Sequence, residues 1–222
     1  MRKRVSLMAS AALVVTLCFG NSANASQAYS FETALDGFFG LGAAVSAETS
    51  IGVTDGTTSM KYLAGGGGFV GARTETVIPA ALNNPPGVKS VMFDMAVTEL
   101  SPNLTFADIG ITIFGHELDG GVFGNQAQFA DTVSIAGLGV GQHNDLVIDL
   151  DLDLFTNQSF NELFGDDVSD LDVASAFQFF ISKTAGVPVT VYIDNVRLVV
   201  PEPTTGLLLG LCVAASVFTR RR

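Results

Sequence analysis

The sequence predicts an all-β fold, an antiparallel β-sandwich of the jelly-roll type. Short runs of alternating apolar and polar residues recur at about ten-residue spacing, and β-branched and aromatic side chains dominate them. Clusters of Gly, Pro, Asn and Asp separate these runs, as expected of turns. No internal repeat and no long helical periodicity interrupts the pattern.

Five runs show the alternation most clearly and are predicted strands: Lys89 to Thr98, Leu104 to Phe114, Asp145 to Phe155, Ala174 to Ser182 and Val187 to Val199. In the first run one face is apolar, with Val91, Phe93, Met95 and Val97. In the third run the apolar face is predicted to extend from Leu146 through Leu152 to Leu154. Gly66, Gly68 and Gly71 match a nucleotide-binding glycine pattern, but a strand follows instead of a helix, so we interpret them as a turn.

Three aspartates of the third run, Asp149, Asp151 and Asp153, are predicted to share the face opposite the leucines. They could bind a cation or a basic partner, although a solvated outer face accounts for them more simply. They do not form an EF-hand loop, because Leu154 and Phe160 stand where that loop requires Gly and Glu.

Charge and cysteine usage restrict the function. Residues 26–200 hold five basic and 21 acidic side chains, a net charge of −16, which argues against nucleic-acid binding. The two cysteines, Cys18 and Cys212, lie in the terminal segments, so the domain between them has no disulfide. That domain must be held together by its core or by a metal.

The N-terminus predicts a secretory signal helix over residues 1–25, with basic residues, an apolar run and small residues in that order. Ala23 and Ala25 fit the pockets of signal peptidase, so we expect cleavage after Ala25, with Ala28 as the alternative.

The C-terminus, residues 200–222, combines three features. Val200-Pro201-Glu202-Pro203 is extended because of its prolines, residues 204–219 predict a short transmembrane helix, and Arg220, Arg221 and Arg222 would stay on the cytoplasmic side. This segment resembles the PEP-CTERM sorting signal, which is also labelled an ice-binding protein C-terminal domain; nothing in the residues indicates ice binding. The resemblance implies a Gram-negative host, processing by an exosortase after transient residence in the inner membrane, and a surface or extracellular destination linked to exopolysaccharide.

The domain between the ends, residues 26–199, has a second resemblance. It opens with Tyr29-Ser30-Phe31-Glu32, continues through residues 53–62, and closes with residues 191–198 (Val-Tyr-Ile-Asp-Asn-Val-Arg-Leu). These segments resemble the galactose-binding-like jelly roll of many carbohydrate-binding modules. The resemblance implies a structural Ca²⁺ held by Glu32 and Asp194, with Asp55 or its neighbours contributing. Pairing of the first and last strands would also bring the two carboxylates together, and a cation would relieve their repulsion.

Catalytic residues are not evident. The mature chain has two histidines, His116 and His143, and no Gly-x-Ser-x-Gly, HExxH or cysteine nucleophile. Sugar binding would have few aromatic platforms, because Trp is absent and the chain has three Tyr. A glycan site would therefore use amides, carboxylates and loop carbonyls, near residues 120–121 or 126–128.

The sequence thus predicts an exported, non-catalytic surface or matrix protein, structural or adhesive, in association with exopolysaccharide. Two alternatives remain open: a glycan-active enzyme with a minimal acidic site, and a self-assembling surface-coat subunit.

Overall fold

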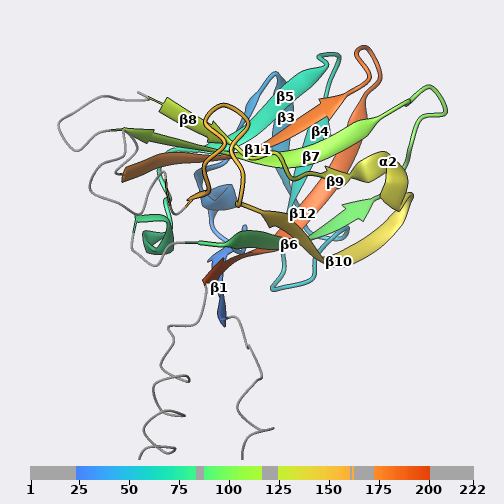
Figure 1. Ribbon diagram of the computed structural model, residues 1–222. Helices are drawn as coiled ribbons and strands as arrows, with labels where there is room; N and C mark the ends of the chain where they lie inside the picture. The colour runs from blue at the N-terminus through green and yellow to red at the C-terminus, as the bar shows by residue number, and fades with distance from the viewer. Residues whose placement is uncertain (1–23, 84–87, 117–124, 161, 163–172, 201–222) are drawn as a thin grey trace, which may run out of the picture. The chain divides into compact units, whose positions relative to one another are not determined.

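The protein folds as two antiparallel sheets packed face to face, as Figure 1 shows for the computed structural model. The structure describes residues 24–83, 88–116, 125–160, 162 and 173–200. Residues 25–200 form one compact unit. The predicted all-β sandwich is confirmed, with short helical turns at η1 (Ala34–Gly37), η2 (Ala80–Asn83) and α2 (Ile135–Leu138).

Sheet A contains the last strand of the domain at its centre. Its order is β10-β6-β12-β4-β3, and β1 also pairs with β12. The first strand therefore lies beside the last. The strands are β1 (Asn24–Tyr29), β3 (Ala43–Glu48), β4 (Ser59–Ala64), β6 (Ser90–Val97), β10 (Gly141–Asp149) and β12 (Val189–Val200). Because β1 begins at Asn24, cleavage after Ala25 would remove its first two residues.

Sheet B has the antiparallel pair β11 and β7 at its centre. Its order is β2-β5-β11-β7-β8, and β9 also pairs with β7. The strands are β2 (Phe39–Leu41), β5 (Phe69–Thr74), β7 (Ala107–His116), β8 (Asn125–Gln128), β9 (Val133–Ser134) and β11 (Val173–Lys183).

The core lies between the sheets and follows the predicted alternation. Val91, Phe93 and Met95 of β6 are fully buried, and Phe177 and Phe179 of β11 face them. The ring of Phe93 meets that of Phe179 edge-on at 5.4 Å between centroids. Each such side chain contributes roughly 1.5–3 kcal/mol when buried, so a core of this size holds the domain without a disulfide.

The alternation fails after Leu150, and the prediction for the third run was wrong there. Strand β10 ends at Asp149, and the chain then leaves sheet A. Leu152 and Leu154 are 45% and 53% exposed, whereas Asp153 is fully buried. The aspartates therefore do not share a solvated face. Asp153 is buried because its carboxylate accepts hydrogen bonds from backbone N–H groups, which outweigh the cost of removing it from water.

Candidate functional site

The outer face of sheet A is closed by the loop of residues 49–58. A side chain at Gly52 would lie 2.5 Å from Cβ of Tyr192, so this loop rests directly on β12. Asp194, fully buried, holds the loop with its carboxylate. Its Oδ2 accepts the backbone N–H groups of Thr54 at 2.6 Å and Asp55 at 2.8 Å, and its Oδ1 accepts that of Asn195 at 2.8 Å.

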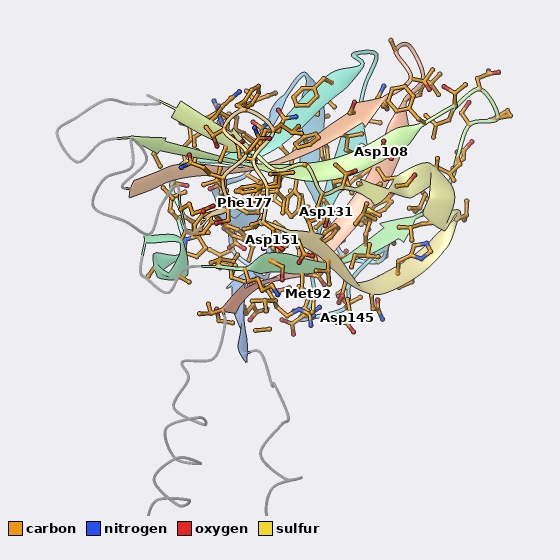
Figure 2. All side chains as sticks on the ribbon, viewed as in Figure 1. Met92, Asp108, Asp131, Asp145, Asp151 and Phe177 are labelled. Atoms are coloured by element: carbon orange, nitrogen blue, oxygen red, sulfur yellow. The ribbon has the colours of Figure 1, made fainter. Side chains whose placement is uncertain are left out.

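Asp94 of β6 stands opposite Asp194 and belongs to the same polar network. Its Oδ2 accepts from the Thr54 hydroxyl at 2.7 Å, and its Oδ1 accepts from the backbone N–H of Asp145 at 2.8 Å. The Arg197 guanidinium pairs with Asp94 at 3.2 Å and with Asp145 at 2.8 Å. Asp145 of β10 is labelled in Figure 2.

Backbone irregularities shape this network. The pairing of β12 with β6 shifts register between Asp194 and Arg197, and that of β10 with β6 shifts between His143 and Leu146. Asn195 and Asp145 lie at these shifts with φ of +50° and +56°. Asn and Asp tolerate such angles better than other side chains, and here the hydrogen bonds to Asp94 and Asp194 fix them.

The three predicted calcium ligands, Glu32, Asp55 and Asp194, all lie around residues 54–58. Glu32 Oε1 accepts the backbone N–H groups of Thr57 and Thr58, each at 2.7 Å. Gln27 donates its amide to Asp55. The Thr57 hydroxyl, which donates to Glu32 Oε2 at 2.7 Å, and the two backbone N–H groups lower the pKa of the Glu32 carboxyl. Burial raises the pKa of Asp194, although the N–H groups that it accepts act in the opposite direction.

The described arrangement does not bring these carboxylates together around one point. Ca²⁺ takes six to eight oxygen ligands, but the oxygens of Glu32 and Asp194 already accept N–H groups on different parts of the loop. Within the described ranges, no group of three or more His, Cys, Asp or Glu side chains is placed to share one metal ion. The calcium site therefore stays a prediction, and the carboxylates serve as loop anchors.

The outer face of sheet B has a different character. Five side chains from five adjacent strands stand in register across it, and we call them the sheet B row: Phe39, Arg73, Gln178, Thr112 and Gln128. They point outward because their neighbours along each strand, such as Phe177 and Ile111, lie in the core. Figure 1 shows these strands as one layer, with β8 at its edge.

Aromatic rings flank the sheet B row. The Arg73 guanidinium lies 5.6 Å from the ring centroid of Phe39 and 5.1 Å from that of Phe114, and it pairs with Glu75 at 2.8 Å. Phe180 lies over Gly110, where any side chain would collide with its ring. The exposed ring of Phe69 stacks on Phe180 at 5.0 Å.

Two polar groups in the middle of the sheet B row have no hydrogen-bond partner in the described part of the chain. The Thr112 side chain is 2% exposed, and its hydroxyl finds no hydrogen-bond partner among the described residues. Gln178 is 6% exposed, and its amide, which lies against Gly71, makes no hydrogen bond within that same part of the chain. Buried polar groups without partners are rare in native proteins, and a bound ligand or water is a common reason for them.

The remaining predicted residues are distributed as follows. Gln126 and Gln128 lie on β8, where Gln128 belongs to the sheet B row, while residues 120–121 lie outside the described residues. His116 is the last residue of β7 in sheet B, and His143 lies on β10 of sheet A. Ala23 and the sorting motif with its arginines are also outside the described residues, as is the predicted segment 204–219. In the part that is described, no helix is long and apolar enough to cross a membrane.

Sequence reasoning missed Phe39, Arg73, Gln178 and Thr112 as candidate binding residues. The local signal was present only in β11, where Gln178 interrupts a run of phenylalanines. The row itself depends on the register between strands far apart in the sequence.

Comparison with known proteins supports both resemblances. Residues 199–222 match the PEP-CTERM protein-sorting motif. This motif implies processing by an exosortase, export, and a surface or extracellular location. No curated protein matches the sequence.

Among solved structures, the domain is similar to carbohydrate-binding modules. A study of promiscuous carbohydrate-binding modules of the β-sandwich superfamily gives a structure with 16% identity and a TM-score of 0.50, which covers 81% of this chain and 64% of that one. The solution structure of the module CtCBM11 has 14% identity and a TM-score of 0.52, and the match covers 81% of this chain and 97% of that one. The family 11 module of the cellulase Lic26A-Cel5E of Clostridium thermocellum has 15% identity and a TM-score of 0.49, and the match covers 80% of this chain and 95% of that one. At such identities the similarity to the first two structures shows a shared jelly-roll fold.

Proposed function

We propose that the protein is an exported, non-catalytic surface or matrix component that binds neutral glycan chains along the sheet B row. The observation that carries this proposal is the centre of the sheet B row, where the buried Thr112 hydroxyl and the neighbouring Gln178 amide have no hydrogen-bond partner among the described residues. Sugar hydroxyls can both donate to and accept from such groups. The exposed rings of Phe39 and Phe69 offer apolar area for the C–H faces of sugars. The fold shared with carbohydrate-binding modules supports this assignment.

Charge favours a neutral ligand over an acidic one. Of the five basic residues in the domain, Arg73 alone lies on the outer face of sheet B, and Glu75 already neutralises it at 2.8 Å. No uncompensated cation on the described part of this face could bind a carboxylate or sulfate group. The net charge of −16 would further repel an acidic polymer.

The termini supply the route to the surface. In this proposal signal peptidase removes residues 1–25, and residues 204–219 hold the precursor in the inner membrane until the exosortase removes the tail. The mature domain is then free to contact exopolysaccharide. Replacing Pro201, Glu202 and Pro203 by alanine in a reporter carrying residues 196–222 should block processing in an exosortase-positive host. Unchanged processing would contradict this route.

The binding proposal is tested by Thr112→Val, which removes the hydroxyl and preserves the shape of the side chain. We expect the free energy of unfolding to rise by about 1 kcal/mol, because an unpartnered buried hydroxyl is lost. We also expect affinity for soluble neutral polysaccharides, such as mixed-linked β-glucan and xylan, to fall roughly tenfold, or about 1.4 kcal/mol. Affinity electrophoresis and denaturant unfolding measure the two effects.

A matched control is Thr190→Val on β12 of sheet A, which should leave affinity unchanged. If the wild-type protein is retained by no neutral polysaccharide, or only by an acidic one such as polygalacturonate, the proposal fails. Turnover of any of these polymers would instead favour the alternative of a glycan-active enzyme.

A further inference from the structure

The segment that follows β10 extends sheet B by one more chain. Asp153 forms a bridge with Phe129, just beyond β8. The backbone N–H of Ala130 donates to the carbonyl of Leu152, and that of Leu154 donates to the carbonyl of Gln128, each at 2.9 Å. Residues 152–154 therefore lie as an additional edge segment beside the end of β8.

Asp153 fixes this segment from inside. Its Oδ1 accepts the backbone N–H of Gln128 at 2.7 Å, and its Oδ2 accepts those of Phe155 at 3.1 Å and Thr156 at 2.8 Å. The Thr156 hydroxyl donates to the same Oδ2 at 2.9 Å. One buried carboxylate thus ties the edge segment to both β8 and its own turn.

The outward edge of the segment is already closed by that turn. The backbone N–H of Asp153 donates to the carbonyl of Gln158 at 2.7 Å, and its carbonyl accepts from Asn157 at 3.0 Å. An edge with satisfied backbone groups gives no template for another strand. Pairing with a second copy through this edge is therefore disfavoured, and the charge of −16 on each domain adds repulsion.

The side chains of this segment continue the sheet B row. Because Asp153 points into the core beside Phe129, Leu152 and Leu154 point to the outer face, with Leu154 facing Gln128. Leu152, Leu154 and the adjacent Phe155 are 45%, 53% and 62% exposed. Five strand spacings separate Phe39 from Leu154, roughly 24 Å, which is long enough for several sugar units.

We propose that Leu152, Leu154 and Phe155 form an apolar platform for one end of the bound glycan chain, held in place by Asp153. This inference rests on the proposed function. The platform would contact the C–H faces of the sugars beyond Gln128, where the polar groups of the row end. Its occupant is the glycan because the apolar side chains are continuous with the row and the adjacent edge is closed to strand pairing.

The test is the double substitution Leu152→Ser and Leu154→Ser in the purified mature protein. Both side chains are about half exposed, so the thermal midpoint should change little. Affinity for mixed-linked β-glucan should fall roughly tenfold. The matched control is Val147→Ser, which removes an apolar side chain that is 40% exposed on β10 of sheet A, and should leave affinity unchanged.

The outcomes separate the platform from the binding face. If the double variant binds like wild type while Thr112→Val is weakened, the platform is refuted and the sheet B row stands. If the double variant retains its affinity but loses self-association in sedimentation velocity, the leucines form a contact between copies, which also refutes the platform. If wild type binds no neutral polysaccharide, both proposals fail.

Discussion

The polar groups on the two outer faces of this sandwich differ in whether they have hydrogen-bond partners within the described residues. On sheet A, Asp94 and Asp194 are buried under the loop of residues 49–58, and their hydrogen-bond donors come from that loop and from strands β10 and β12. On sheet B, the buried Thr112 hydroxyl and the Gln178 amide have no hydrogen-bond partner among the described residues. The first arrangement stabilises the fold, whereas the second provides the polar groups to which the proposed glycan would bind.

The largest effect that this comparison predicts is on stability. Asp94→Ala should lower the free energy of unfolding by about 3–5 kcal/mol, because the Arg197 guanidinium, the Thr54 hydroxyl and the Asp145 N–H lose their shared acceptor. Denaturant unfolding measures this loss. Glycan affinity per folded molecule should be unchanged, so a variant that stays stable but loses affinity would contradict the separation of the two faces.

A smaller effect concerns pH. Burial raises the pKa of Asp194 above its usual value, so the folded state binds this proton more tightly than the unfolded state. Stability from this group therefore declines as pH rises from the usual to the raised pKa. The contribution of Glu32 to stability depends on pH in the opposite direction. Its pKa is lowered in the folded state, so the stability that it contributes is lost as pH falls through the lowered pKa.

Asp194→Asn isolates the first of these contributions. The variant should be less stable than wild type, because an amide cannot accept all of the N–H groups that meet this carboxylate. The difference between the two proteins should be smaller at about pH 7 than at about pH 4, where wild-type Asp194 carries its proton more often. A difference that grows with pH would show that the carboxylate is stabilised in the folded state instead.

The smallest expected effect is that of calcium. The resemblance to carbohydrate-binding modules predicts a stabilising ion at Glu32, Asp55 and Asp194, whereas their hydrogen bonds leave no shared set of free oxygens. From this arrangement we expect thermal melts with Ca²⁺ and with chelator to coincide. A higher midpoint with Ca²⁺ would show that the loop rearranges to bind the ion, and it would restore the predicted site.

The sequence was sufficient for the architecture but not for the binding face. Alternation located β6 and β12 because each buries one side on a common core, and this requirement is local. The same rule failed at Leu152 and Leu154, since alternation does not reveal that N–H groups from β8 and a turn will meet the Asp153 carboxylate. The sheet B row depends on register among five strands, which no single segment encodes.

The most direct test of the central claim is amide chemical-shift mapping of the ¹⁵N-labelled mature protein during titration with a neutral β-glucan oligosaccharide. We expect shifts at Phe39, Arg73 and Gln178 on sheet B, extending to Leu154, with little change in residues 49–58. Shifts confined to that loop or to sheet A would contradict it.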